Sequence, residues 1–205
     1  MLTLFHSPGS CSNGILYLLN EIAVPHEVAV VNVLNGDQRT EAYLSRNPKG
    51  KVPALLTDDS QMITEFQSIA FWLARQHPEA GLWPDDVWRQ TRTLEALDFI
   101  VGSVHMRGRV FIRMPQKFLE DPTCKLALQS HGRQQVRNGL AYLETLLGDQ
   151  QYLLGDFGVA DAAMLYVLDW AVRDELDLSA SLLGYRQRLR ARPAFSASAD
   201  NWGPI

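Results

Sequence analysis

NPKGKVPALLTDDSQMIT, at residues 47–64, contains two turn sequences and two short apolar runs. Residues 47–50 have the Asn, Pro and Gly content of a turn. The run from Val52 to Thr57 is typical of a strand and carries Pro53 near its start. Asp58-Asp59-Ser60 is a second turn sequence, and residues 61–64 follow it as a returning strand. The stretch therefore predicts a β-hairpin.

The residues before and after this hairpin predict the rest of a small mixed sheet. Leu2 to His6 is an apolar run typical of a strand, and apolar residues at helical spacing follow from Ile15 to Ile22. Residues 27–33 alternate like a second strand, a short helix is expected over 39–45, and a longer helix over 65–76 closes the unit. The order β-α-β-α-β-β-α joins a βαβ unit to a hairpin, which is the thioredoxin-like arrangement.

The remainder of the chain shows helical periodicity only. Residues 78–86 contain two prolines, a glycine and three acids, and are the best candidate for a linker. Apolar stripes at helical spacing then occupy four segments, which are Leu94 to Val104, Val136 to Leu147, Ala160 to Ala171 and Leu182 to Ala191. We therefore expect an α/β domain over 1–77, a linker over 78–86 and an all-helical bundle over 87–205.

Composition argues against several classes of protein. The 205 residues are 46% hydrophobic and 20% charged, with a net charge of -4, so nothing favours binding to nucleic acid or to an anionic membrane surface. The first residues lack the basic and apolar regions of a secretory signal, and no apolar run approaches the roughly 18 residues that span a bilayer. The two cysteines, Cys11 and Cys124, belong to no metal-ligand or disulfide pattern. We expect a cytoplasmic protein without a metal.

Cys11 is the first candidate for chemistry. It follows a predicted strand and begins a predicted helix, where backbone N–H groups and the helix dipole favour a negative charge. That charge is carried by the thiolate, which is the reactive form of cysteine. Ser10 and Ser12 suit two roles equally, as helix caps or as hydrogen-bond donors to the thiolate. By position alone, a lone cysteine also suits a small buried hydrophobe.

Five segments, in this order, resemble the cytosolic glutathione S-transferases, most of all the bacterial beta class. They are SPGSCS at 7–12, NPKGKVPAL at 47–55, TE at 64–65, VH at 104–105 and LGDFGVADA at 154–162. The second and fifth together are specific for the fold, and the first is typical of the beta class. The resemblance covers nearly the whole chain. It implies a homodimeric enzyme that conjugates glutathione, as co-substrate, to small electrophiles.

The resemblance assigns catalytic roles to Cys11, Ser12 and His105. The matching cysteine of the beta class lies beside the glutathione sulfur and forms a mixed disulfide with it. Ser10 would contact glutathione next to this cysteine. The histidine that matches His105 points at the active site in the beta class, although from the residues alone a structural histidine is the default. The family usually continues with lysine where this chain has Met106.

The resemblance also assigns the groups that hold glutathione. Val52, before a cis Pro53, would offer its backbone N–H and C=O to the cysteinyl part, and Lys51 would meet the glycyl carboxylate. Glu65 would accept hydrogen bonds from the γ-glutamyl ammonium, while backbone N–H groups at the same helix start hold the carboxylate. The family usually has serine or glycine next, and here Phe66 removes the hydroxyl and keeps the N–H. Without the resemblance, Pro53 suits an ordinary proline at the start of a strand, and Lys51 suits a solvated surface charge. Glu65 then suits an acidic residue in the first turn of a helix.

Residues of the helical half complete the set of candidates. Asp98 falls where the family has a polar contact to glutathione across the subunit boundary. His105, Arg109 and Arg113 are spaced i, i+4 and i+8, so they share a helical face that suits an anionic ligand. For the two arginines, a solvated charged face is the preferred interpretation. Asp161 resembles the third helical residue of a capping box.

Two other functions remain open from the sequence. The first is a glutathione-dependent disulfide reductase in which Cys11 turns over through a mixed disulfide. No second cysteine lies nearby in the sequence, so glutathione itself would resolve it. The second is a non-catalytic binding protein that keeps the fold but not the site, which Phe66 and Met106 favour.

Overall fold

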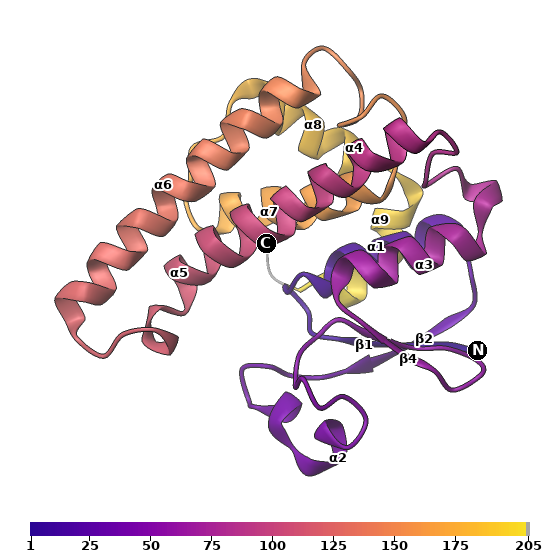
Figure 1. Cartoon of the computed structure of the whole chain (residues 1–205), viewed down its shortest axis with the longest axis horizontal. Coiled ribbons are helices and arrows are strands. Elements are labelled where there is room, and N and C mark those ends of the chain that lie inside the picture. The colour runs from indigo at the N-terminus through magenta and orange to yellow at the C-terminus, as the bar shows by residue number, and fades with distance from the viewer. Residues whose placement is uncertain (204–205) are drawn as a thin grey trace. The chain divides into compact units, whose positions relative to one another are not determined.

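A computed structural model describes residues 1–203 of the chain. Its contacts form two compact units (Figure 1). The N-terminal unit comprises Met1–Pro84 and the described part of Gln187–Ile205, and the helical unit comprises Asp85–Arg186. The division falls inside the predicted linker and, a second time, within helix α8 (Ala180–Arg190).

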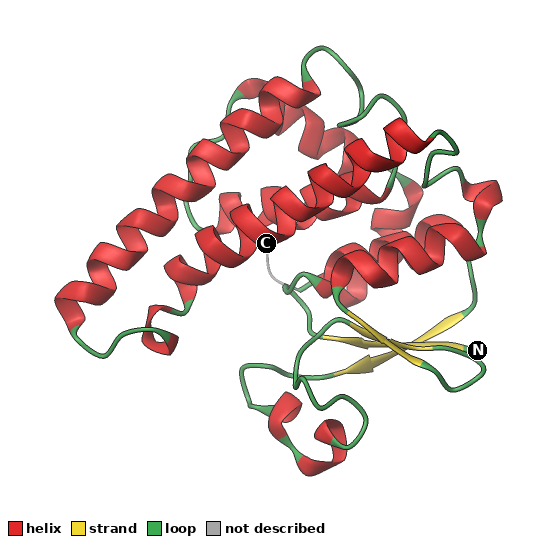
Figure 2. Cartoon of the chain, in the orientation of Figure 1, coloured by secondary structure: helices red, strands yellow, loops and turns green. Residues whose placement is uncertain are grey.

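The N-terminal unit contains a four-stranded mixed sheet (Figure 2). Its strands lie in the order β2-β1-β3-β4, with β1 parallel to β2 and antiparallel to β3. Their bounds are β1 (Leu2–His6), β2 (His26–Val30), β3 (Ala54–Leu56) and β4 (Met62–Thr64). The predicted hairpin is confirmed, since Leu55 of β3 pairs with Ile63 of β4. Strands β2 and β3 are shorter than the sequence predicts.

Helices cover both faces of this sheet. They are α1 (Ser12–Ile22), α2 (Glu41–Leu44) and α3 (Phe66–Gln76), with short 3₁₀ turns at η1 (Asp37–Arg39) and η2 (Pro78–Ala80). Successive residues of a strand point to opposite faces, and both Leu4 and Phe5 are buried. Phe5 packs edge-on against Tyr43 of α2, while α1 and α3 lie together over the other face (Figure 1). The predicted thioredoxin-like arrangement is confirmed.

The last helix, α9 (Pro193–Trp202), packs against α1 in the N-terminal unit. The Tyr17 hydroxyl of α1 donates to the Leu189 carbonyl, and Arg192 forms an ion pair with Glu21 of α1. The boundaries of the compact units thus differ from the predicted domains, which assign all of 87–205 to the helical bundle. The difference arises from contacts between residues about 170 positions apart, which periodicity does not reveal.

The helical unit contains no strand among its described residues, as predicted. Its helices are α4 (Val87–Asp98), the π-helix η3 (Phe99–Arg109), α5 (Val110–Arg113), the 3₁₀ turn η4 (Pro115–Lys117), α6 (Pro122–Leu147), α7 (Val159–Arg173) and the first part of α8. None of the helices in residues 1–203 is both long and apolar enough to cross a membrane.

The π-helix η3 replaces part of the α-helix that the stripe from Leu94 to Val104 predicts. A π-helix bonds i to i+5, so its side chains do not keep the α-helical spacing. Leu94 is 50% exposed, whereas Val104 is buried against α6. There, a Cβ atom on Gly139 of α6 would lie 2.5 Å from Val104 Cγ2, so glycine permits the close approach of the two helices.

Candidate active site

Cys11 contacts the loop that precedes β3. It is the N-cap residue of α1 and is partly exposed. Its thiol donates a hydrogen bond to the Val52 carbonyl, with 3.7 Å between Sγ and O. The peptide bond between Val52 and Pro53 is cis, as the resemblance implies. Two segments that lie 41 positions apart in the sequence, and that were both predicted to belong to the site, are therefore in contact.

The first N–H groups of α1 donate within the Cys11 loop. The Ser12 N–H donates to Ser10 Oγ at 3.2 Å, the Asn13 N–H to the Ser10 carbonyl and the Gly14 N–H to the Cys11 carbonyl, both at 3.1 Å. The sequence predicts that such groups stabilise a thiolate, but these three point to other oxygen atoms. The dipole of the 11-residue helix still favours a negative charge at the sulfur. Cys11 itself is the N-cap residue, while Ser10 Oγ accepts the N–H of the first residue of α1.

Ser12 lies inside the unit and belongs to a hydrogen-bonded chain. Its Oγ is 2.7 Å from His6 Nδ1 and 2.7 Å from Ser10 Oγ, and it accepts the Ser7 N–H at 3.0 Å. His6 Nε2 donates to the Asn201 carbonyl at 2.7 Å, which leaves Nδ1 as the acceptor of the Ser12 hydroxyl hydrogen. Burial lowers the pKa of His6 and so favours this neutral form.

His6 is not among the residues that the sequence predicts for the site. Its only signal was its position as the last residue of β1, directly before the cysteine segment. Ser12, which is among the predicted residues, is fully buried, and its hydroxyl hydrogen points to His6. Its catalytic role stays a prediction, and the contacts describe a residue that positions the loop.

The end of α9 holds the same loop from the other side. The Trp202 carbonyl accepts hydrogen bonds from the Gly9 N–H at 2.9 Å and from Asn13 Nδ2 at 2.8 Å. Gly203 follows with a φ of +80°, and a Cβ atom there would lie 2.7 Å from the Gly9 nitrogen. The main chain on both sides of Cys11 is thus fixed by a segment about 190 residues away in the sequence.

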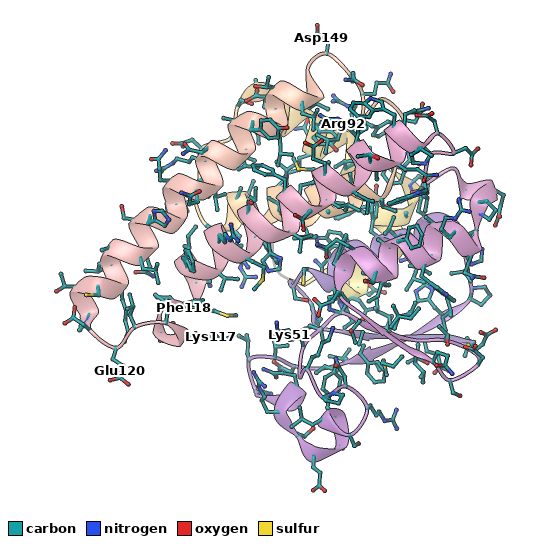
Figure 3. The ribbon with its side chains drawn as sticks, viewed as in Figure 1. Lys51, Arg92, Lys117, Phe118, Glu120 and Asp149 are labelled. Carbon is teal, nitrogen blue, oxygen red and sulfur yellow. The ribbon has the colours of Figure 1, made fainter. Side chains whose placement is uncertain are left out.

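The turn before Val52 is also rigid. The Tyr43 hydroxyl and the side-chain amide of buried Asn47 both donate to the Lys51 carbonyl, at 2.7 Å and 2.9 Å. Burial raises the pKa of Tyr43, so the phenol remains a donor. The Lys51 side chain itself is exposed and extends from the ribbon (Figure 3). This turn presents the Val52 main chain next to Cys11 in a defined orientation.

Glu65 occupies the N-cap position of α3 with an unusual backbone conformation, at a φ of 72°. Its side chain makes no capping bond and pairs with Lys49, whose Nζ lies 2.7 Å from Glu65 Oε1 and 2.9 Å from Thr64 Oγ1. The local pattern around neither residue predicts this pair. Phe66 is 3% exposed, and its ring packs in the core.

His105 and Asp98 belong to the helical unit. The His105 ring lies edge-on to Trp170 and Tyr166 of α7, with ring centroids 4.8 Å and 5.9 Å away. Asp98 ends α4 and is exposed. The roles of both residues toward glutathione stay predictions. No three His, Cys, Asp or Glu side chains in the described part of the chain are grouped as metal ligands.

Arg109 is not part of a solvated face. Its guanidinium lies 3.9 Å over the Trp170 ring and donates to Asp174 at 2.9 Å. The side chains of Arg109 and Asp174 are 16% and 2% exposed. Burial lowers the pKa of Arg109 to about 10, and Asp174 opposes this shift. The preferred interpretation of this arginine is therefore wrong, because Asp174, the residue directly after α7, supplies a buried carboxylate that compensates its charge.

Comparison with known proteins identifies the family. The glutathione S-transferase N-terminal domain matches residues 9–76, and the glutathione S-transferase C-terminal domain matches residues 72–197. Glutathione S-transferase GstA of Escherichia coli O157:H7 is 30% identical over 201 residues, which cover 94% of each chain.

Solved structures agree. A glutathione transferase homologue from Sulfitobacter with bound glutathione has a TM-score of 0.91 at 26% identity, over 98% of this chain and 97% of that one. The bacterial beta class glutathione S-transferase of Sphingomonas chungbukensis has a TM-score of 0.84 at 30% identity, over 99% and 100%. Both halves of the sequence, and the fold that they adopt, show that this chain belongs to the glutathione S-transferase family.

Proposed function

We propose that this transferase conjugates glutathione to small electrophiles, with the glutathione sulfur held beside Cys11. The hydrogen bond between the Cys11 thiol and the Val52 carbonyl carries the proposal. Val52 is the residue whose main chain would pair with the cysteinyl part of an extended glutathione. A cysteinyl residue bound there brings its sulfur next to the Cys11 sulfur. The glutathione bound to the Sulfitobacter homologue supports the choice of ligand.

In the proposed reaction, the glutathione thiolate attacks an electrophilic carbon. A carbon–sulfur bond forms, and the leaving group departs with its electron pair, while the thiol proton passes to solvent. Glutathione supplies the nucleophile, so Cys11 acts as a neutral donor to the thiolate. Its S–H already points to a carbonyl, and a glutathione N–H that takes over this carbonyl releases the Cys11 S–H for the neighbouring sulfur.

The other predicted residues complete the binding site in the proposal. Glu65 and the N–H groups at the start of α3 receive the γ-glutamyl end, and the inward-facing Phe66 ring leaves room for it. Lys51 receives the glycyl carboxylate. Asp98 and His105 keep the roles that the resemblance assigns to them, with the contact of Asp98 made across the subunit boundary. Ser10 and Ser12 hold the Cys11 loop through their mutual hydrogen bond.

Disulfide reduction is the second candidate, because Cys11 is partly exposed. A Cys11 thiolate would attack the glutathione sulfur of a mixed disulfide between glutathione and a second thiol compound, form a Cys11–glutathione disulfide and release that compound as its thiolate. A glutathione thiolate would then attack the Cys11–glutathione disulfide, which regenerates Cys11 and releases oxidised glutathione. The N-terminal unit contains a single cysteine, so glutathione has to supply this second thiolate. A binding protein without catalysis is the third candidate, supported by Met106 where the family has lysine.

Two variants, compared with the wild type, separate these functions. Isothermal titration with glutathione should give heat for the wild type, and conjugation to a nitro-activated aryl chloride should be measurable. Cys11→Ala should lose the glutathione adduct, seen by intact mass after treatment with oxidised glutathione, and retain conjugation. Cys124→Ser, at the exposed second cysteine, should behave as wild type in both assays.

Each contrary result has a distinct meaning. Conjugation that disappears with Cys11→Ala, together with rapid disulfide turnover by the wild type, would favour the reductase. Heat without turnover of either kind would favour the binding protein. No heat and no conjugation by the wild type would reject the proposal.

We also propose that the enzyme is a cytoplasmic homodimer. Family membership supports the dimer, and large apolar side chains on α4, among them Val87 and Trp88, are exposed as an interface requires. Sedimentation velocity at micromolar concentration should give about twice the mass of 23.1 kDa. A monomer at these concentrations would contradict the proposal.

A further inference from the structure

Lys49 and Glu65 place two opposite charges side by side at the start of α3. Lys49 Nζ lies 2.7 Å from Glu65 Oε1, and it also donates to Thr64 Oγ1 at 2.9 Å. The two side chains are 51% and 52% exposed. A pair that is this exposed is weak, since water solvates both charges. It is therefore open to exchange with the charges of a ligand.

The main chain on both sides keeps this pair in place. The Lys49 N–H donates to Asn47 Oδ1 at 3.2 Å, and Gly50 follows with a φ of +58° in a turn where a Cβ atom would lie 3.0 Å from the Gln38 carbonyl oxygen. Glu65 follows β4 directly. Lys49 precedes the first strand of the hairpin and Glu65 follows the second, so the turn and the strand bring them together although they are 16 positions apart in the sequence.

From this arrangement we infer that Lys49 is a specificity-determining residue that binds the α-carboxylate of the γ-glutamyl group, while Glu65 binds its ammonium. The inference rests on the proposed glutathione function. The γ-glutamyl end carries an ammonium and a carboxylate on one carbon atom, so it presents two opposite charges a few ångströms apart. The Lys49–Glu65 pair presents the complementary two charges at similar spacing. A zwitterion can replace their single contact by two charge-assisted hydrogen bonds.

Phe66 explains why a lysine is needed here. The side chain at position 66 has no hydroxyl to donate to the carboxylate, and its ring is buried. The Lys49 ammonium has three donors on a flexible stem. It can turn from Glu65 to the incoming carboxylate and leave Glu65 to the incoming ammonium. Lys49 thus supplies the donor that position 66 lacks.

A different role for Lys49 makes the opposite prediction. If the lysine only neutralises Glu65, it competes with the ligand ammonium, and its removal strengthens binding. If it binds the carboxylate, its removal weakens binding, and only for ligands that carry this carboxylate. A glutathione analogue in which 4-aminobutyrate replaces the γ-glutamyl residue keeps the ammonium at the end of the chain and lacks the carboxylate.

The test is isothermal titration of both ligands into the full chain and into its variants. The wild type should bind glutathione at least about fivefold more tightly than the analogue, because the carboxylate contacts both the half-exposed Lys49 and the N–H groups at the start of α3. Lys49→Met should weaken glutathione binding about fivefold without weakening binding of the analogue, so that the preference is reduced to the share of the N–H groups. Lys49→Arg should restore most of the wild-type preference for glutathione over the analogue. In steady-state conjugation, KM for glutathione should rise in Lys49→Met with kcat unchanged.

Arg46→Met, at an exposed cation in the same unit, is the matched control and should keep the preference. Added salt should reduce the preference of the wild type and not that of Lys49→Met. The inference is overturned if Lys49→Met binds glutathione as tightly as the wild type or more tightly. It is also overturned, without any variant, if the wild type binds both ligands equally. A wild type that binds neither would reject the proposed function as well, whereas the other two results would leave that function intact.

Discussion

The imidazole of His6 and the hydroxyl of Ser12 are hydrogen-bonded inside the N-terminal unit, with 2.7 Å between Nδ1 and Oγ. The other ring nitrogen donates to the Asn201 carbonyl. One histidine thus connects the end of β1, the Cys11 loop and the last helix. In this direction the bond requires a neutral ring, because a protonated Nδ1 cannot accept the Ser12 hydroxyl hydrogen.

Acid should destabilise the protein through His6. Burial lowers the folded-state pKa of this histidine below its ordinary value of 6.5. Between these two values the unfolded chain binds more protons, so the free energy of unfolding falls as the pH drops below about 6.5. Urea unfolding at pH 7, 6 and 5 should show this fall, with a smaller slope in His6→Gln. His131→Gln, at an exposed histidine, should keep the wild-type slope, and equal slopes in all three proteins would contradict the prediction.

Asp161 should stabilise the folded protein as the pH falls, which is the opposite of the effect of His6. It is buried, and burial raises its pKa from 3.8 to about 6, against the hydrogen bonds from the Tyr185 hydroxyl and the Leu153 and Gly158 N–H groups. The folded state binds the proton more tightly, so the contribution of Asp161 to stability grows as the pH falls from about 6 to 4. Asp161→Asn should remove this contribution in the same urea series. A pH profile that does not change with this substitution would show that Asp161 titrates normally.

Asp161→Ala should lower the free energy of unfolding by more than the removal of an exposed helix cap does. The substitution leaves buried donors without an acceptor, at roughly 3 kcal/mol or more in all, compared with about 0.5–2 kcal/mol for a lost cap. Thermal and urea unfolding at pH 7 measure the difference. Asp86→Ala, which removes the exposed N-cap acceptor of α4, is the matched control and should stay within the cap range. Equal losses in both variants would contradict the role of the buried network.

Gly203→Ala should disturb the Cys11 loop. The added Cβ atom would lie 2.7 Å from the Gly9 nitrogen and 2.8 Å from the Pro8 carbonyl carbon. We expect a loss of about 1–3 kcal/mol and an altered rate of alkylation at Cys11, with the rate at Cys124 unchanged. Gly36→Ala is the control, because its φ of +84° carries a similar backbone cost while nothing lies within 4 Å. Cys11 reactivity that changes equally in both variants would rule out a specific effect of the close contact.

Arg109→Leu should strongly destabilise the helical unit. It leaves the buried Asp174 carboxylate without its closest cation, which costs about 3 kcal/mol or more. Asp174→Asn added to Arg109→Leu should recover part of the loss, as a double-mutant cycle would show. Arg92→Leu, at the more exposed pair with Glu95, should cost less than about 1 kcal/mol. A small effect of Arg109→Leu would indicate that Arg113, 3.7 Å from Asp174, compensates the charge.

Local sequence determined the elements of this protein. Alternating apolar residues, the turn at 47–50 and the hairpin turn at 58–60 predicted the strands and their order, because these features depend on neighbouring residues. The position of Cys11 at the start of α1 followed from the same patterns. The resemblance added the cis bond before Pro53, which the structure contains.

Tertiary structure alone decided how the site is built. Four interactions join residues from different elements. They are the His6–Ser12 hydrogen bond, the hydrogen bonds from the Cys11 loop to the Trp202 carbonyl, the Lys49–Glu65 ion pair and the buried Arg109–Asp174 ion pair. A lysine in a turn and an arginine on a helix have the same local pattern whether solvated or paired. The difference depends on which carboxylate the fold brings within reach, and no local periodicity contains that information.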